Sequence, residues 1–338
     1  MLEHSSYVHC LYIDFTKAFD TVNHQILLDK LAYLDLHPAI VALISSFLFN
    51  RTQSTRFGST TSWPSPITRS IVQGSGLGPI LYIIYMSDLK TLCDLNKLCL
   101  YADDTSLLIP QSTNVSIADE LENIKLWAFI NKLIINWLKT KQMVLRRPNL
   151  NASLLPPPLP DIELVHCIKL LGVYVSCVFN QEAHVNFITL AASQRLYLLK
   201  MLKLNGLNNK SLDCIFSAIV ISRIIYAIEA WGNYVTKEMI GKIDKMLKKA
   251  RRWGLCSTLL NFEEIKQERC KLLFKNICKN KMHCLSHLLP PERPQLKSLR
   301  PREHNYQIPE VSKQLHRKSF LIDSLIKGGI TAKTTKME

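Results

Sequence analysis

The stretch LYADDTSLLIP, Leu100 to Pro110, places two adjacent carboxylates, Asp103 and Asp104, inside an otherwise apolar run. Burying an unpaired carboxylate is costly, and two neighbouring carboxylates repel each other. One interpretation is a β-hairpin with strands at 98–102 and 105–109 and both charges exposed at its tip. The other is a metal site at that tip, to which a third carboxylate comes from elsewhere. The stretch alone favours the turn, and the rest of the sequence decides between the two.

The composition points to a globular protein with an anionic partner. The chain has 338 residues, of which 47% are hydrophobic, enough for two or more domains with their own cores. Its formal net charge is +15, and residues 236–304 hold 17 Lys and Arg against 7 Asp and Glu. Solvated helix faces account for only a few of these cations. The surplus predicts nucleic acid as the first candidate partner and an acidic membrane surface as the second.

Cysteine usage and the N-terminus favour a reduced, intracellular protein. Ten cysteines occur without a C-x-x-C pair, and no apolar leader opens the chain. One Cys/His group could suggest zinc, but its spacing fits no standard pattern, so buried helix cysteines are preferred. This group comprises Cys270, Cys278, His283, Cys284 and His287. Because Arg223 interrupts the apolar run 215–228, we expect no transmembrane helix and no membrane partner.

The predicted elements divide the chain into a mixed half and a helical half. Up to about residue 180 strands alternate with helices, and a proline-rich loop occupies 148–160. From residue 182 onward the pattern is helical and basic. The predicted helices cover 20–34, 38–49, 80–92, 116–136, 184–204, 208–230 and 236–256. The predicted strands cover 8–15, 98–102, 105–109 and 142–146, with further short strands in 51–71 and 162–175.

A further carboxylate, Asp14, ends the first predicted strand in LYIDFTKAFD, where it could bind a hard cation. A lone Asp at a strand end is more often a cap or turn residue. Nucleotidyl transfer uses two Mg²⁺ ions about 4 Å apart, held by carboxylates from different strands. Asp14 and Asp103 meet this need if their strands are neighbours. Because adjacent strand residues face opposite sides, we expect Asp103 to face the ions and Asp104 to be accessory.

Between these carboxylates lies the glycine-rich segment QGSGLGP, Gln73 to Pro79. Glycines at alternate positions let the backbone approach a ligand closely. A dinucleotide-binding loop requires G-x-G-x-x-G, but here Gly78 comes one position early and Pro79 takes the last place. A nicotinamide-dependent oxidoreductase is therefore the weakest interpretation. A glycine-rich turn without function is the plain alternative to a substrate-binding segment.

Five segments in order resemble the sequential motifs of reverse transcriptases: YIDFTKAFDTVNH, IVQGSGLGP, YADDT, WAFINKLIINWLKTKQM and IKLLGV. The resemblance is closest to the polymerases of non-LTR retrotransposons of the jockey and CR1 type. It continues more weakly through QRLYLLKMLKLNGL and IIYAIEAWG and then fades. It implies an α+β fold: a right-hand polymerase palm at 1–180, with an antiparallel sheet packed on helices. An α-helical thumb-like domain at 181–260 and a basic, partly irregular helical tail at 261–338 would follow.

The resemblance also implies catalytic roles. Asp14 and Asp103 match the two metal-binding carboxylates, with Asp104 as the neighbour of the pair, and the Phe15 carbonyl matches a backbone metal ligand. Lys139 matches a proposed proton donor to pyrophosphate; its plain alternative is a solvated cation at a helix end. The implied cofactor is a pair of Mg²⁺ ions, with Mn²⁺ as a substitute.

Substrate-binding roles follow from the same resemblance. Phe19 matches the bulky residue beneath the incoming sugar, where an aromatic ring leaves no room for a 2′-hydroxyl; its alternative is a core Phe. The residues implied to line the template–nucleotide pocket are Gln73, Gly74 and Ser75. Gly172 lies in the hairpin implied to grip the primer. The cations implied to contact duplex phosphates without base readout are Lys245, Lys248, Lys249, Arg251 and Arg252.

The sequence also departs from the family pattern. Val72 stands where the family usually has Pro, a change that we expect function to tolerate. The chain begins at the first catalytic strand, so we expect a truncated copy without most of the fingers and without an upstream endonuclease. The implied activity is RNA-directed DNA polymerisation with an RNA template, a DNA primer and dNTPs, in a nuclear and cytoplasmic ribonucleoprotein. The alternative is a nucleic-acid-binding remnant that has lost turnover.

Overall fold

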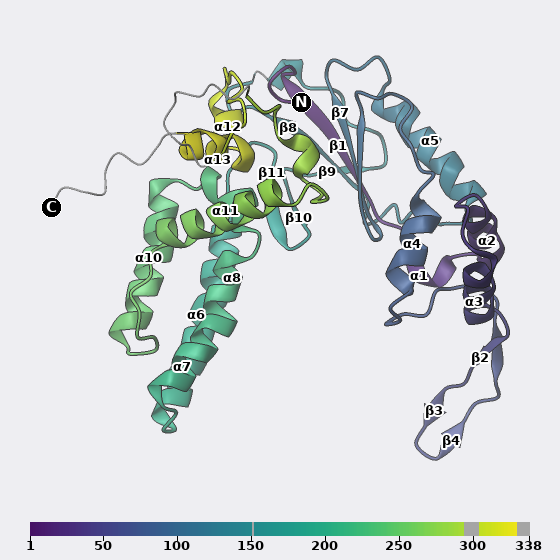
Figure 1. The fold of residues 1–338 in the computed structure, drawn as a ribbon, viewed down its shortest axis with the longest axis horizontal. Coiled ribbons are helices and arrows are strands. Elements are labelled where there is room, and N and C mark those ends of the chain that lie inside the picture. Colours follow the sequence, from purple (N-terminus) through teal and green to yellow (C-terminus); the bar gives the residue numbers. More distant parts are fainter. Residues whose placement is uncertain (151, 294–303, 330–338) are drawn as a thin grey trace. The chain divides into compact units, whose positions relative to one another are not determined.

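A computed structural model describes residues 1–150, 152–293 and 304–329, and the chain separates into two compact units, Met1–His166 and Cys167–Glu338 (Figure 1). From the sequence, the change from mixed strands and helices to helices alone is predicted near residue 180. The structure assigns one more hairpin, Cys167–Ser176, to the second unit. This hairpin forms a two-stranded sheet of its own and packs against the first helix of that unit.

The first unit is built on a five-stranded sheet with the strand order β6-β7-β1-β8-β9. β1 reads as a continuous apolar run because it is the central strand, and six of its seven residues are buried. The pairs are antiparallel, as expected, except that β9 runs parallel to β8. The strands are β1 (Tyr7–Ile13), β6 (Lys97–Tyr101), β7 (Asp104–Pro110), β8 (Lys141–Arg146) and β9 (Glu163–Leu164).

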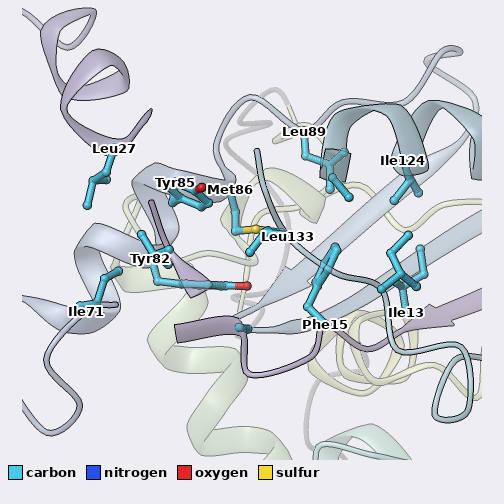
Figure 2. Close-up of a cluster of buried hydrophobic side chains, with 14 of the residues drawn as sticks. Ile13, Phe15, Leu27, Ile71, Tyr82, Tyr85, Met86, Leu89, Ile124 and Leu133 are labelled. Atoms are coloured by element: carbon cyan, nitrogen blue, oxygen red, sulfur yellow. The ribbon is translucent and has the colours of Figure 1, made fainter. Parts of the chain in front are cut away.

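Five helices share one core with this sheet. Figure 2 shows part of that core, in which Ile13 of β1 lies near Ile124 and Tyr85 near Met86. The helices begin where their sequences predict: Pro79 stands in the first turn of one, and Ser116 forms a capping box with Asp119 in another. They are α1 (Ala18–Thr21), α2 (His24–Ala32), α3 (Pro38–Leu48), α4 (Gly78–Met86) and α5 (Ile117–Ile130).

A ribbon of short strands joins α3 to α4, in agreement with the strands and turns predicted there. Its two ladders pair Arg51 with Ile67 and Phe57 with Thr60. The strands are β2 (Arg51–Gln53), β3 (Arg56–Phe57), β4 (Thr60–Thr61) and β5 (Ser65–Ile67).

Three predicted helices of this unit are shorter than expected, and the one predicted at 80–92 ends at Met86. The helix at 20–34 is interrupted because Val22 is not helical and Asn23 caps α2 through its side chain. The helix at 116–136 ends at Ile130, and Lys132 has a positive φ of 55°. Apolar residues beyond this point continue the pattern because they enter the same core from a non-helical segment, so periodicity alone overestimates the helix.

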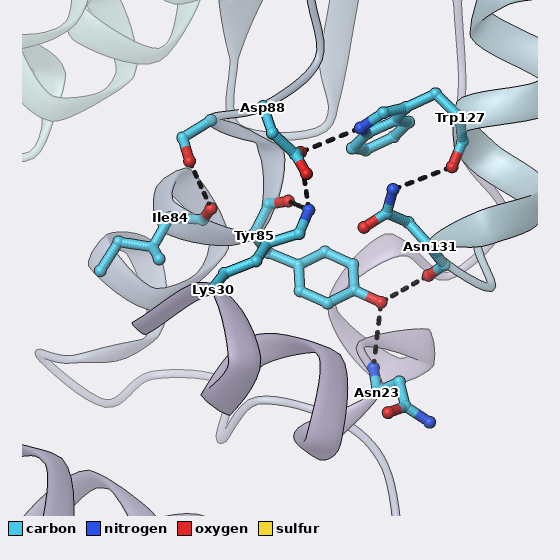
Figure 3. A network of polar contacts seen from close by, with 8 residues as sticks. Asn23, Lys30, Ile84, Tyr85, Asp88, Trp127 and Asn131 are labelled. Carbon is cyan, nitrogen blue, oxygen red and sulfur yellow. Dashed lines mark hydrogen bonds and ion pairs between the residues drawn. The ribbon is translucent and has the colours of Figure 1, made fainter. Parts of the chain in front are cut away.

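A polar network connects α2, α4 and α5 (Figure 3). The Lys30 ammonium forms an ion pair with Asp88 at 2.7 Å, and the Trp127 indole donates to the same carboxylate at 2.9 Å. The Tyr85 hydroxyl donates to the Asn131 carbonyl. Burial lowers the pKa of Lys30, and Asp88 opposes this shift. The network therefore holds three helices together with partly buried, paired charges.

The second unit is helical, with a core to which its first six helices contribute. The hairpin consists of β10 (Cys167–Leu170) and β11 (Val173–Ser176). The six helices are α6 (Glu182–Leu204), α7 (Asn209–Phe216), α8 (Ser222–Ile225), α9 (Ile228–Trp231), α10 (Lys237–Arg252) and α11 (Phe262–Lys279). Two more, α12 (Gln314–Arg317) and α13 (Phe320–Gly329), follow near the C-terminus, and α13 packs on α11. Residues 294–303 and 330–338 of the predicted tail lie outside the described residues.

The predicted helix at 208–230 is not one regular helix. A π-helical turn occupies Ser217–Ile221, and Ala227 has a positive φ of 49° between α8 and α9. By length and composition alone, 209–234 could cross a membrane, so the expectation that no stretch reaches that length is wrong. Length and composition alone are weak evidence for a membrane span, because core helices of soluble proteins meet the same criteria. The apolar window of this segment is 28% buried, and Phe216, Val220 and Trp231 contribute to the core of the unit.

The first unit also contains a buried carboxylate that ties α5 to the loop after α4. Glu120 is fully buried, and its Oε1 accepts from the Leu92 amide at 2.9 Å and from the Asn96 side chain at 2.7 Å. Glu120→Ala leaves both donors without this acceptor, so we expect the free energy of unfolding to fall by about 2–4 kcal/mol in urea titrations. Glu122→Ala removes only an exposed ion pair on the same helix, and we expect a change within about 0.5 kcal/mol. Equal effects would contradict this role of Glu120.

Candidate active site

The strand pairing brings the three predicted carboxylates to one end of the sheet. β1 pairs with β7 up to Ile13 and Thr105, so Asp14, the next residue, comes to the end of β7 that carries Asp104. β6 pairs Tyr101 with Asp104, which leaves Ala102 and Asp103 as the hairpin turn. Ala102 has a φ of 52°, a left-handed conformation that is uncommon for a residue with a Cβ. The predicted hairpin is confirmed, with its strands shifted by about one residue at the tip.

The charges of this group repel one another. Asp14 and Asp103 are half-buried and Asp104 is exposed. Burial, followed by the neighbouring charges of Asp103 and Asp14, raises the pKa of Asp104. Neighbouring carboxylate charges are costly unless protons or cations neutralise them. The turn interpretation and the metal interpretation of LYADDT therefore describe the same hairpin, whose exposed tip carries a surplus of negative charge.

The donor set suits Mg²⁺ better than a metal that needs a closed protein cage. Among the residues that the structure describes, no three His, Cys, Asp or Glu side chains form a metal-binding group. Mg²⁺ commonly takes one or two carboxylates and completes its shell with waters and substrate phosphates. Asp14 and Asp103 supply the carboxylates. Phe15 forms a bridge with Ile135 that uses the Asp14 carbonyl and the Thr16 amide, so the Phe15 carbonyl is not an acceptor in that bridge.

Lys139 lies beside this group, as the resemblance implies. Its ammonium is 3.8 Å from an Asp14 carboxylate oxygen, and its side chain is 70% exposed. The segment that carries it is fixed to the end of β1: the Asn136 amide donates to the Asp14 carbonyl at 2.7 Å. The Asp14 amide in turn donates to the Thr140 hydroxyl at 3.4 Å. No local pattern predicts the role of Thr140, because the contact joins residues far apart in the chain.

The glycine-rich segment packs against the segment that follows Asp14. The Gln73 side-chain amide donates to Asp20 at 2.8 Å, and the Phe19 ring stacks on Tyr82 with centroids 4.5 Å apart. Gly74 has a φ of 81°, which favours glycine. The Ser75 hydroxyl donates to the Val72 carbonyl and accepts from the first amide of α4. Ser75 therefore has a structural role in this turn, and Asp20 and Tyr82 are contacts that the sequence did not predict.

In the second unit, the hairpin predicted to grip the primer has a tight turn at Leu171 and Gly172, whose φ values are 46° and 86°. The Tyr226 hydroxyl donates to the Leu171 carbonyl at 2.8 Å. A Cβ on Gly172 would lie 3.1 Å from the Tyr226 ring. Gly172 is thus required both by its backbone conformation and by the close approach of Tyr226.

α10 presents its cations to solvent. Its buried face consists of Met239, Ile243, Met246, Leu247 and Ala250. The five predicted nucleic-acid-binding cations all lie on the exposed face: Lys245, Lys248, Lys249, Arg251 and Arg252. The Lys249 ammonium lies 4.5 Å from the centroid of the Trp253 ring, an aromatic partner that the charge count could not show. The Arg251 guanidinium also donates to the Cys256 carbonyl.

The C-terminal Cys/His group is spread over the end of α11 and the turn after it. Cys270 is buried on α11, where burial raises the pKa of its thiol to about 11. Cys278 is half-buried on the same helix, and Cys284 is exposed beyond it. The prediction of a buried helix cysteine is confirmed for Cys270 and does not hold for Cys284.

Comparisons with known proteins agree with the motifs. Residues 1–175 match the family described as reverse transcriptase (RNA-dependent DNA polymerase). The chain is 30% identical over 253 residues to the RNA-directed DNA polymerase from mobile element jockey of Drosophila funebris, covering 68% of this chain and 26% of that protein. It is 27% identical over 268 residues to a probable RNA-directed DNA polymerase from transposon BS of Drosophila melanogaster, covering 73% and 29%. The chain thus spans little more than a quarter of these relatives.

Similarity to solved structures is more distant. Telomerase from Candida tropicalis, in complex with a TWJ fragment of telomeric RNA, has a TM-score of 0.40 and 12% identity, covering 84% of this chain and 48% of that one. At this level the likeness bears on neither the fold nor the site.

The repulsion among the carboxylates leads to a pH prediction. The raised pKa of Asp104 means that the folded chain binds more protons there than the unfolded chain, so its charge costs stability once the pH exceeds the ordinary Asp pKa. In metal-free buffer at pH 7 and low salt, we expect Asp104→Asn to raise the melting temperature by about 1–3 °C. The gain should vanish as the pH falls below the ordinary Asp pKa. Asp94→Asn, an exposed control, should change nothing, and a gain that persists at low pH would contradict the prediction.

Proposed function

Because the chain belongs to the reverse transcriptase family, we propose that it acts as the palm and following helical region of a non-LTR retrotransposon RNA-directed DNA polymerase. One observation carries the proposal: the β1–β7 register brings Asp14 to the hairpin of Asp103 and Asp104, with Lys139 3.8 Å from Asp14. Carboxylates from two neighbouring strands are what two-metal nucleotidyl transfer requires.

In this proposal Asp14 and Asp103 hold two Mg²⁺ ions with the Phe15 carbonyl. When bound, such ions lower the pKa of the primer 3′-hydroxyl and neutralise the leaving pyrophosphate. Lys139, 3.8 Å from Asp14, would donate a proton to the pyrophosphate. Asp104 is accessory: its charge adds to the attraction for cations without facing them.

The pocket residues set nucleotide choice. Phe19, held against Tyr82, would exclude a 2′-hydroxyl and so favour dNTPs. Gln73, held by Asp20, would line the template–nucleotide pocket together with Gly74. The second unit would act as a thumb, with Gly172 at the primer-gripping turn and the exposed cations of α10 on duplex phosphates.

The alternative function, nucleic-acid binding without turnover, rests on a different observation. The exposed cationic face of α10 would bind phosphates whether or not the carboxylates support catalysis. The two functions differ in their dependence on Asp103: catalysis requires its charge, whereas phosphate binding does not.

Primer extension on an RNA template with Mg²⁺ and dNTPs tests the proposal. We expect the chain to extend the primer and Asp103→Asn to lose roughly 100-fold or more of the rate, because a metal-binding charge is removed. Asp94→Asn keeps the rate as the matched control. Equal duplex affinity of all three chains shows that folding and binding are intact. If none extends the primer although all bind, the chain is a binding remnant.

The contribution of α10 can be measured through salt dependence. Each phosphate contact that is lost should lower the slope of log K against log salt by about 0.7–0.9. For Lys245→Ala with Lys248→Ala, we expect the slope to fall by about 1.5 for a template–primer duplex. Lys90→Ala with Lys97→Ala changes charge equally in the first unit and should leave the slope unaltered. If the two double variants had equal slopes, α10 would not contribute to the interface with the duplex.

A further inference from the structure

The ribbon of short strands between α3 and α4 leaves two large aromatic rings in solvent. Phe57 is 88% exposed and Trp63 is 93% exposed, and every residue of 52–66 is exposed. Figure 1 shows the ribbon projecting beyond α3, away from the sheet of the first unit. A two-stranded hairpin is marginally stable in water, and unburied rings contribute little to its stability. Both rings are therefore exposed for contact with a partner.

The base of the ribbon is fixed beside the predicted nucleotide pocket. The Arg51 guanidinium donates to the Ser70 carbonyl at 3.2 Å, which holds the two sides of the ribbon together at its base. The Ile71 amide then donates to the Phe19 carbonyl at 3.0 Å, two residues before Gln73. The ribbon and the segment that carries Gln73 thus share one anchor, from which the ribbon leads outward.

The residues around the two rings favour an anionic partner. Arg56 is the neighbour of Phe57 in β3, and the ladder brings it opposite the strand that leads to Trp63. No Asp or Glu occurs at 36–87, so no carboxylate of this stretch repels a phosphate. Eight of the fifteen residues at 52–66 are Ser or Thr, whose hydroxyls bind phosphate and sugar oxygens without a charge of their own.

Two other kinds of partner fit the ribbon less well. A strand from a second copy of the chain would pair with the ribbon edge, but Pro64 and Pro66 have no amide hydrogen to donate there. An acidic membrane surface attracts clusters of about four to eight cations, whereas Arg56 is the only Lys or Arg in 52–66. Exposed rings with few charges instead match single-stranded nucleic acid, whose bases stack on aromatic side chains whatever their sequence.

We propose that the ribbon, residues 51–67, is a platform for single-stranded nucleic acid: Phe57 and Trp63 stack on bases, and Arg56 contacts a phosphate. The proposal rests on the function proposed above, in which this strand is the unpaired RNA template that leads to the pocket at Gln73. At roughly 3.4 Å per residue, Phe57 lies about 20 Å along the ribbon from its base. The rings therefore contact the template ahead of the pocket and add to the duplex contacts proposed for α10.

Binding in EDTA, without catalysis, isolates the ribbon. Fluorescence anisotropy compares a template–primer duplex that has a single-stranded RNA overhang with the same duplex cut blunt. We expect Trp63→Ala and Phe57→Ala each to lose roughly fivefold or more of the affinity for the overhang substrate, because one stacked base is lost. Affinity for the blunt duplex should not change. Tyr33→Ala is the matched control, since Tyr33 is 89% exposed outside the ribbon and should not affect either affinity.

Salt dependence separates stacking from charge. We expect Trp63→Ala to lower the affinity for the overhang substrate by the same factor at every salt concentration. Arg56→Ala should instead lower the slope of log K against log salt by about 0.7, the value for one phosphate contact on a single strand. Lys90→Ala removes an exposed cation elsewhere in the same unit and should leave the slope unaltered.

Three results would overturn the proposal. The first is wild-type affinity for the overhang substrate in both Trp63→Ala and Phe57→Ala. The second is an equal loss of affinity for the blunt duplex. The third is a loss of self-association in sedimentation, or of binding to phosphatidylserine vesicles, with RNA binding unchanged. If the wild-type chain binds the overhang through the ribbon but does not extend primers, the proposed function fails and the assignment of the ribbon stands.

Discussion

The antiparallel pairing of β1 with both β7 and β8 is the constraint on which the site depends. The pairing with β7 sets Asp14 opposite the end of the hairpin that carries Asp103 and Asp104. The pairing with β8 begins at Lys141, so the residues just before it run beside the end of β1, where Lys139 meets Asp14. A slip of one residue in either ladder would turn the central strand over. The buried side chains on both faces of β1 prevent that slip.

Polar groups in the first unit have two separate roles. The pairs centred on Lys30 and Glu120 join helices to one another and to loops through an ion pair and hydrogen bonds. Around Asp103 the balance is different: the carboxylates repel one another, and the hydroxyls of Tyr82 and Thr105 have no described partner. The repulsion among these carboxylates is unfavourable energy that a bound cation could release.

The sequence predicts those features of the fold that depend on local patterns. An apolar run defines β1, Pro79 and Ser116 mark helix starts, and the Asp-Asp pair marks a turn between alternating strands. Helix ends were less predictable, because apolar residues after Ile130 belong to the same core without being helical. The contacts of Gln73 with Asp20 and of Phe19 with Tyr82 join residues more than 50 positions apart. Such contacts depend on tertiary packing and leave no local pattern.

The two units differ in the charges that they expose: carboxylates at the hairpin of the first unit and cations on α10 of the second. A group of uncompensated carboxylates repels polyanions. The exposed cations of α10 attract phosphates, whereas the predicted catalytic carboxylates belong to the first unit. α10 holds seven Lys and Arg against two Asp and Glu, a net +5 out of the +15 charge of the chain. Under the proposed function, cations that bind Asp14 and Asp103 would reduce the repulsion between these carboxylates and a phosphate.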